Sequence, residues 1–159
     1  MSHRPTCRAP SLTRREMLRN TAWAGFGIWT VSRCATGAES RSPNEKLNIA
    51  GIGVGGQGAW NIGNCAGENV VALCDVDERR AKGSLERFPK AKKYRDFRKL
   101  LDEMGNQIDA VLVATPDHIH APAAVAAMRM GKHCYCEKPL AHTVGEVRMM
   151  IQLATKNKL

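Results

Sequence analysis

The most informative stretch for the fold is the hexapeptide Gly53-Val54-Gly55-Gly56-Gln57-Gly58, which lies in the run KLNIAGIGVGGQGAW (residues 46–60). Its glycines have the spacing Gly-x-Gly-x-x-Gly, and they follow a strand-like run and precede a helix-like segment. At such a junction the first glycine allows a tight turn, the second lets a pyrophosphate approach the backbone, and the third lets the helix pack closely on the strand. The free N–H groups at the start of the helix attract phosphate. We therefore predict a dinucleotide-binding loop formed by Gly53, Gly55, Gly56, Gln57 and Gly58.

From Lys46 onward, strand-like and helix-like segments alternate along the chain. The expected strands are residues 47–53, 70–74, 109–114 and 132–136, with a short edge strand at 93–94. Helix signals lie between them: Asp96 as a cap and Gly105 as a stop, Pro122 in a first turn and Gly131 at an end, and a capping box from Thr143 to Glu146. The order βαβαβαβαβα predicts an α/β fold with a doubly wound parallel sheet, the Rossmann fold, incomplete at its C-terminal end.

An acidic residue follows the glycines at the distance that a dinucleotide site requires. Asp75 ends the second strand, 22 residues after Gly53, where a carboxylate can accept hydrogen bonds from the adenosine ribose. The alternative, a glycine-rich turn that binds no ligand, is less favoured because of this acidic residue. The register Gly51-x-Gly53-x-x-Gly56 also fits the spacing, but it would start the turn inside the strand. Asp75 favours NAD, whereas Arg79 and Arg80 just beyond it leave NADP open.

The basic charge is concentrated in two stretches of the chain. The 159 residues carry a formal net charge of +9, with 43% hydrophobic residues, a composition that is ordinary for one modest domain. Residues 1–41 hold seven Lys and Arg against two acidic residues, and residues 79–99 hold ten against two. We interpret the second stretch as a solvated helix face, because no aromatic platform or recognition helix accompanies it. No nucleic-acid partner is expected.

The first stretch looks like an export leader. Arg14-Arg15 precedes the uncharged run TAWAGFGIWTV at residues 21–31, and small residues follow where a peptidase could cut. Residues 1–41 are therefore predicted to be a twin-arginine signal peptide, residues 42–45 a linker and residues 46–159 the nucleotide-binding domain. The run is too short to span a bilayer, so no stable membrane anchor is expected. The prediction is a periplasmic or otherwise exported protein that meets the twin-arginine export machinery; an N-terminal helix of the domain is the alternative.

The cysteines and histidines do not form a recognisable metal site. Cys134 and Cys136 are spaced i, i+2 in a strand-like segment, which suits buried free thiols better than a zinc or redox pair. His118 and His120 lack a second cluster at ligand spacing. No metal is expected.

Two further motifs carry a resemblance to a known family. Thr115-Pro116-Asp117-His118-Ile119-His120 follows the fourth strand, and Glu137-Lys138-Pro139 follows the fifth. With the glycine turn, they resemble the TPxxxH and EKP motifs of the Gfo/Idh/MocA oxidoreductases over residues 46–159. The resemblance implies that both segments line the nicotinamide end of a cleft and that Lys138 reaches the cofactor and the substrate oxygen. Asp117 departs from the family, in which Asn is more usual.

The position of Lys138 also makes chemical sense without the resemblance. Ligands of open parallel sheets bind beyond the carboxyl ends of the strands, and both Thr115 and Lys138 lie there. An ammonium at this place can stabilise the alkoxide of a sugar-like alcohol and can carry its proton. Lys138 is therefore the predicted catalytic residue. Thr115, Pro116, His120 and Glu137 join the predicted cofactor-binding set, although Lys138 could be a surface residue and His120 could instead cap its helix.

The resemblance further implies a second α/β domain with a catalytic histidine and the substrate contacts. Because the sequence ends at Leu159, we expect a fragment that binds dinucleotide weakly at best and does not turn over substrate. A homo-oligomer is possible for the full-length protein. Three functions follow: an exported NAD(P)-dependent oxidoreductase for a sugar or polyol, an NAD-dependent glycosidase, or a non-enzymatic dinucleotide sensor.

Overall fold

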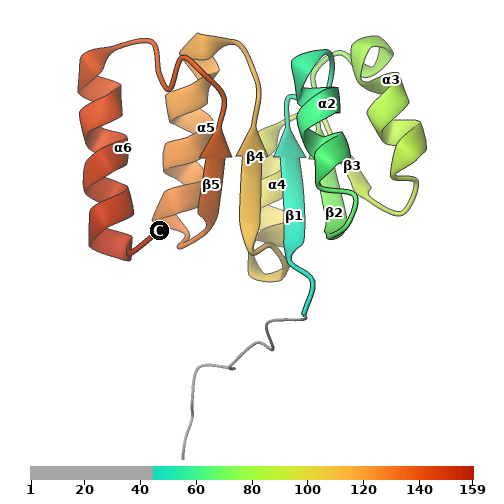
Figure 1. Cartoon of the computed structure of the whole chain (residues 1–159), viewed down its shortest axis with the longest axis horizontal. Helices are drawn as coiled ribbons and strands as arrows, with labels where there is room; N and C mark the ends of the chain where they lie inside the picture. Colours follow the sequence, from blue (N-terminus) through green and yellow to red (C-terminus); the bar gives the residue numbers. More distant parts are fainter. Residues whose placement is uncertain (1–44) are drawn as a thin grey trace, which may run out of the picture. The chain divides into compact units, whose positions relative to one another are not determined.

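A computed structural model describes residues 45–159, and they form a parallel sheet with helices on both faces (Figure 1). The strand order is β3-β2-β1-β4-β5, and every neighbouring pair is parallel. The elements in chain order are β1 (Asn48–Ile52), α2 (Gln57–Asn64), β2 (Asn69–Cys74), α3 (Glu78–Arg87), β3 (Lys92–Tyr94), α4 (Phe97–Met104), a 3-10 turn (Gly105–Gln107), β4 (Ala110–Val113), α5 (Asp117–Arg129), β5 (His133–Cys136) and α6 (Val144–Asn157). The predicted doubly wound α/β fold is confirmed.

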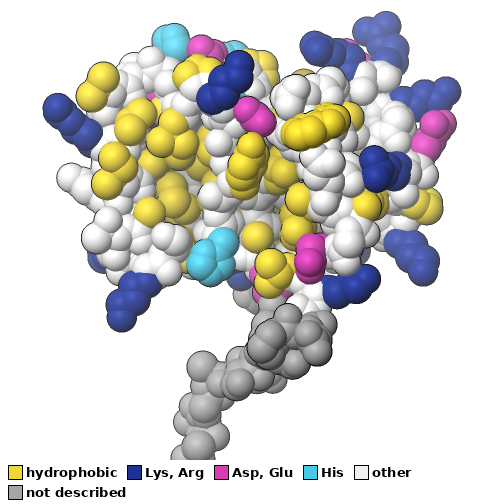
Figure 2. All heavy atoms as spheres, viewed as in Figure 1, with side chains coloured by type: hydrophobic (Ala, Val, Ile, Leu, Met, Phe, Trp, Pro, Cys, Tyr) yellow, Lys and Arg dark blue, Asp and Glu magenta, His cyan; other side chains and the backbone are white. Residues whose placement is uncertain are grey.

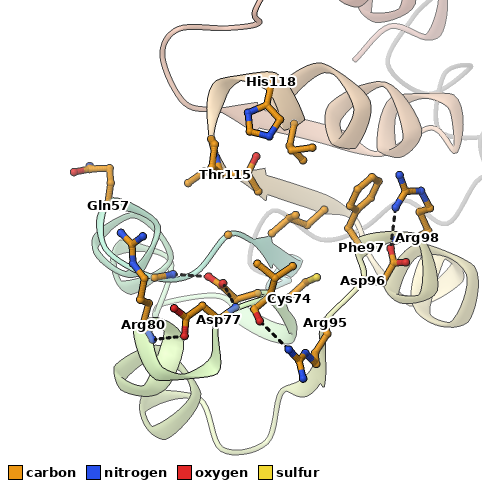
Figure 3. Close-up of a pocket in the computed structure, with 18 residues that line it drawn as sticks. Gln57, Cys74, Asp77, Arg80, Arg95, Asp96, Phe97, Arg98, Thr115 and His118 are labelled. Carbon is orange, nitrogen blue, oxygen red and sulfur yellow. Dashed lines mark hydrogen bonds and ion pairs between the residues drawn. The ribbon is translucent and has the colours of Figure 1, made fainter.

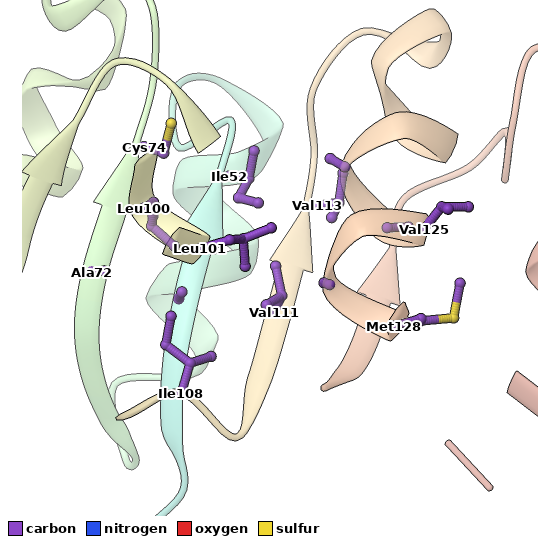
Figure 4. Close-up of a cluster of buried hydrophobic side chains, with 14 of the residues drawn as sticks. Ile52, Ala72, Cys74, Leu100, Leu101, Ile108, Val111, Val113, Val125 and Met128 are labelled. Atoms are coloured by element: carbon purple, nitrogen blue, oxygen red, sulfur yellow. The ribbon is translucent and has the colours of Figure 1, made fainter. Parts of the chain in front are cut away.

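Two hydrophobic cores hold the helices on the sheet. On one face, α2 and α3 cover β1 and β2, with Ile62, Leu73 and Ala81 fully buried between them. On the other face, α4 and α5 pack on β1, β2 and β4, with Leu100 and Val113 at 0% exposure (Figure 4). Small side chains on α5 let its backbone approach the sheet closely, because Ala123, Ala124 and Ala127 are all fully buried.

Most of the local signals in the sequence are confirmed. Asp96 caps α4 by accepting a hydrogen bond from the Arg98 N–H at 2.9 Å, and Thr143 with Glu146 forms the capping box of α6. Gly131 follows the end of α5 with φ of 73°, a left-handed conformation that glycine adopts without strain. Helix α4 ends at Met104 with Gly105 as its C-cap residue, as predicted, but Gly105 keeps right-handed helical dihedrals and leads into the 3-10 turn.

The prediction for Pro122 is wrong. Helix α5 begins at Asp117, so Pro122 is its sixth residue and lies inside the helix instead of in the first turn. The first turn is fixed earlier by two hydrogen bonds: the Ile119 N–H donates to the Pro116 carbonyl, and the His118 N–H donates to the Asp117 carboxylate. Pro122 is exposed, so its ring points away from the sheet and does not disturb the packing.

Exposed apolar side chains gather beside the edge strand β5. They belong to β5, the segment after it and α6: Tyr135, Leu140, Val144, Met149 and Ile151. Figure 2 shows hydrophobic side chains collected over this part of the molecule, with Lys and Arg side chains standing mainly at the margins of the same face.

The predicted signal peptide and linker, residues 1–45, lie outside the described residues except for Glu45. Within residues 45–159, no helix has both the length and the apolar character needed to cross a membrane.

Candidate functional site

A cavity of about 680 Å³ opens at the carboxyl ends of the strands (Figure 3). The glycine loop (residues 53–58), the end of β2, the start of α4 and the Thr115-Pro116 segment surround it. Six of the predicted cofactor-binding residues line this cavity: Gly53, Gly55, Gln57, Asp75, Thr115 and Pro116. The other predicted residues are not among the residues that line it: Gly56, Gly58, His120, Glu137 and Lys138.

Three positions of the glycine loop have no room for a side chain: Gly53, Gly55 and Gly58. Gly53 has φ of 77°, and a β-carbon on it would lie 2.7 Å from the Ala114 carbonyl oxygen. A β-carbon on Gly55 would lie 3.0 Å from the Arg80 β-carbon, and one on Gly58 would overlap the Gly53 carbonyl oxygen. Gly51 lies within β1, so the turn starts at Gly53. The loop therefore presents bare backbone N–H groups at the start of α2, which suits a pyrophosphate.

Asp75 fixes the shape of the glycine loop. Its Oδ2 accepts hydrogen bonds from the N–H groups of Val54 and Gly55 at 2.9 and 3.0 Å, and its Oδ1 accepts one from Asp77 at 2.9 Å. The two donors on Oδ2 use both of its lone pairs, whereas Oδ1 has one lone pair left; Asp75 lines the cavity, so Oδ1 can also accept from a ribose hydroxyl. Ser84 adds a contact that the sequence did not indicate, because its buried hydroxyl donates to the Val54 carbonyl at 2.6 Å.

Arginines stand around the ribose side of the cavity. The first is Arg80, whose guanidinium would be 3.6 Å from a β-carbon on Gly56. Arg95 donates to the Val76 carbonyl at 3.2 Å, and both arginines line the cavity. Asp77 caps α3 nearby; desolvation raises its pKa, but hydrogen bonds from the Arg80 and Arg79 N–H groups lower the pKa more, so the net shift is downward. The carboxylate of Asp75 and these guanidinium groups give this end of the cavity mixed charge.

Thr115 lines the cavity and carries a polar group that is not used within the described residues. Its Oγ1 is buried and has no hydrogen-bond partner among the described residues. A buried hydroxyl without a partner costs free energy, so a ligand that hydrogen-bonds here would be favoured. Together with the bare glycine backbone, this atom makes the described residues a good fit for a dinucleotide.

His120 is not among the cavity-lining residues, and it bridges two segments. It is 2% exposed, and its Nε2 is 2.6 Å from the Thr115 carbonyl oxygen while its Nδ1 is 2.7 Å from the Pro139 carbonyl oxygen. Both partners are acceptors, so a neutral ring, which has one N–H, can donate to only one of them, whereas a doubly protonated ring donates to both. The ring is not among the cavity-lining side chains, and it ties the segment after β4 to the segment after β5.

The EKP segment (Glu137-Lys138-Pro139) lies beyond the end of β5, outside the cavity lining. Glu137 accepts hydrogen bonds from the Asn61 side-chain amide at 2.7 Å, from the Lys138 N–H at 3.1 Å and from the Tyr135 hydroxyl at 3.3 Å. The Asn61 hydrogen bond is the largest cause that lowers the pKa of Glu137, so its carboxylate is ionised at neutral pH. Lys138 is exposed, and its side chain is available to solvent.

The described cysteines are free thiols. Burial raises the pKa of Cys74 and of Cys134 to about 12 and that of Cys136 to about 11. At neutral pH these thiols are protonated and weakly nucleophilic. Among residues 45–159, no three His, Cys, Asp or Glu side chains are grouped so that they could hold a metal ion; the absence of a metal stays a prediction.

The model of an oxidoreductase family with an NAD-binding Rossmann fold, GFO_IDH_MocA, matches residues 46–159. The chain belongs to the Gfo/Idh/MocA oxidoreductase family. Inositol 2-dehydrogenase of Salmonella typhimurium is 34% identical over 115 residues, which cover 70% of this chain and 34% of the relative. A glycosyl hydrolase family 109 protein of Saccharopolyspora erythraea is 30% identical over an alignment of 179 positions. The alignment covers 95% of this chain and 38% of the relative.

Among solved structures, this chain is similar to an oxidoreductase of Agrobacterium radiobacter in complex with NAD+, L-tartaric acid and magnesium. The TM-score is 0.62 with 25% identity, over 72% of this chain and 34% of that one. The chain spans about a third of the length of the curated relatives that it matches first. Family membership and this similarity support the binding of NAD or NADP.

Proposed function

We propose that this chain is the nucleotide-binding part of an exported oxidoreductase that transfers hydride between a sugar or polyol and NAD(P). One observation carries the proposal: the bare glycine backbone, the Asp75 carboxylate and the unpartnered Thr115 hydroxyl surround a single cavity. Backbone N–H groups at the start of α2 would hold the pyrophosphate, and Asp75 would accept from the adenosine ribose. Thr115 would bind at the far side of the cavity. Bound NAD or NADP supplies the hydride acceptor.

Lys138 is the proposed proton-handling residue of this reaction. Its exposed ammonium follows β5 at the same sheet edge as Thr115 follows β4. The ammonium would stabilise the substrate oxygen as that oxygen loses its proton, and Glu137 beside it stays ionised and balances its charge. The exposed apolar side chains of β5 and α6 adjoin this segment, which supports the packing of a further, substrate-binding surface there. We propose that the 159 residues alone bind dinucleotide without turnover.

A second candidate function is an NAD-dependent glycosidase that oxidises its sugar transiently. The family 109 relative favours it, because that similarity extends over 95% of this chain, whereas the inositol 2-dehydrogenase similarity covers 70%. The additional similarity extends into the proposed leader region. In a chain joined to its substrate-binding part, net reduction of added NAD during substrate consumption identifies the dehydrogenase. Consumption without net reduction identifies the glycosidase.

Calorimetric titration of the chain with NAD and with NADP tests the nucleotide site. We expect weak binding that Gly55→Ala reduces roughly tenfold, about 1.4 kcal/mol, because the new methyl group would press on Arg80 and narrow the phosphate cradle. Gly67→Ala is the matched control, since nothing lies within 4 Å of a β-carbon there. A folded chain that binds neither nucleotide, or a Gly55→Ala variant that binds like the control, would refute the proposal.

A further inference from the structure

A chain of side-chain hydrogen bonds joins the helix of the glycine loop to the EKP segment. The Gln57 Nε2 donates to the Asn61 Oδ1 at 3.1 Å, and the Asn61 Nδ2 donates to the Glu137 Oε1 at 2.7 Å. Gln57 and Asn61 lie one turn apart on α2, whereas Glu137 follows β5, 76 residues further along the chain. The two segments that the sequence predicts to bind the phosphates and the reacting end of the cofactor are therefore directly connected.

Asn61 is an unusual residue for its position. It is 5% exposed and sits on the buried side of α2 next to Ile62, where an apolar side chain would pack without polar cost. A buried amide is stabilising only when its donors and acceptor have partners. Here both ends of the amide are used, and the one partner outside its own helix is Glu137. The contact therefore requires a hydrogen-bond acceptor at residue 137, which the Glu137 carboxylate supplies.

Glu137 in turn fixes the backbone that leads to Lys138. Its Oε2 accepts from the Lys138 N–H at 3.1 Å, while its Oε1 is held by Asn61 and, at 3.3 Å, by the Tyr135 hydroxyl. A carboxylate with donors on both oxygens has one preferred orientation. Because one of the donors is the Lys138 N–H, that orientation also defines how the chain turns at Lys138. The Lys138 side chain itself stays exposed and makes no hydrogen bond that would fix it independently among the described residues.

We propose that Asn61 is a positioning residue. It holds the Glu137 carboxylate in one orientation and thereby sets the direction in which the Lys138 side chain extends from the backbone. The inference rests on the proposed function for the role of Lys138, but its contacts do not depend on it. Asn61 does not line the cavity, and it contacts the glycine loop only as the acceptor for the Gln57 side chain, so we expect its effect on the EKP segment and little effect on the backbone N–H groups that would hold phosphate.

NMR titration of the Glu137 carboxyl group, with Glu146 as an internal reference, tests the proposal. In the unaltered chain the pKa of Glu137 lies below its ordinary value of 4.5. Asn61→Ala removes the largest cause of this shift and raises the pKa. Asn61→Asp raises it further, because a second carboxylate then faces the first. Faster exchange of the Lys138 amide hydrogen should accompany both changes, since its acceptor is no longer fixed.

Control variants make the result specific. Asn64→Ala changes an exposed residue of the same helix and should leave the pKa of Glu137 unchanged. Tyr135→Phe removes the longer hydrogen bond from an exposed residue and should give a smaller rise than Asn61→Ala. This variant retains a readout if the buried substitutions prevent folding. An ordinary pKa for Glu137 in the unaltered chain, or equal values in Asn61→Ala and Asn64→Ala, would overturn the proposal.

A parallel titration with NAD separates this inference from the proposed function. Asn61→Ala should bind NAD within about threefold of the unaltered chain, a change of about 0.7 kcal/mol or less. Failure of every variant to bind NAD would count against the nucleotide site while leaving the Glu137 result intact. A loss of NAD binding in Asn61→Ala alone would mean that Asn61 acts on the glycine loop, and this would refute its assignment to Lys138.

Discussion

Replacing Gly58 by alanine is the most direct perturbation of the junction between β1 and α2. The added β-carbon would overlap the Gly53 carbonyl oxygen and lie 2.8 Å from its carbonyl carbon and 3.3 Å from the Ala114 β-carbon. The two Gly53 atoms belong to the backbone of a loop that is itself held, because the Gly53 N–H donates to the Cys74 carbonyl at 2.8 Å. Neither side can yield without moving the helix or breaking that hydrogen bond.

The expected cost follows from this geometry. Overpacking by one methyl group costs about 1–3 kcal/mol, and the upper part of that range applies here because the neighbours are backbone and not a flexible side chain. A net stability of about 5–15 kcal/mol makes such a loss visible. Urea denaturation followed by circular dichroism should show a lower midpoint, and thermal denaturation should show a melting temperature lower by about 4 °C or more per kcal/mol.

The same substitution at Gly83 should have the opposite sign. Gly83 lies inside α3, is exposed, and has nothing within 4 Å of an added β-carbon. Alanine there removes backbone entropy from the unfolded chain and should stabilise the helix by about 0.5–1 kcal/mol. If Gly58→Ala is as stable as the unaltered chain, or if both variants lose stability equally, close packing of helix on strand is not the reason for the third glycine.

Three further outcomes are expected. Asp96→Ala should destabilise the protein by about 0.5–2 kcal/mol in thermal denaturation, because α4 loses its cap, whereas Asp102→Ala on the exposed side of the same helix should change little. His120→Ala should cost about 1–3 kcal/mol in urea denaturation, because two backbone carbonyls lose their ring partner; a cost under about 0.5 kcal/mol would contradict the bridging role. The pKa of Cys134, raised by burial to about 12, should make alkylation of this thiol at about pH 8 much slower in the folded chain than in urea, as measured by mass spectrometry; equal rates would contradict its burial.

The sequence predicts well the features that short-range chemistry determines. The strands are apolar runs bounded by turn residues, and the predicted caps Asp96 and Thr143 act on N–H groups two or three residues away. The glycine turn is equally local, since the spacing of its glycines reflects the path of one loop. Pro122 shows the limit of such signals. Its preference for a first turn is outweighed by hydrogen bonds that start the helix at Asp117.

The sequence could not predict the contacts that cross the sheet. Asn61 in a helix carries no signal of its own, and its partner Glu137 is reached only because β1, β4 and β5 are neighbours in the sheet. The same is true of Ser84, whose hydroxyl meets the Val54 carbonyl across 30 residues of chain. His120 was expected at the cofactor or at a helix cap. Only the fold shows that both its nitrogens face carbonyl oxygens of two separate segments.

These long-range contacts have a common target. Asn61 reaches the EKP segment from α2 through Glu137, and His120 reaches it from α5 through the Pro139 carbonyl. Lys138 therefore lies between two residues that are each anchored to a different helix on a different face of the sheet. Lys138, the proposed proton-handling residue, has a long and flexible side chain. Holding that side chain still in the free protein would bring little benefit, but the backbone from which it extends has to be fixed. The three motifs are thus structurally linked. The helices that begin at the glycine loop and at Thr115-Pro116 also fix the backbone position of Lys138.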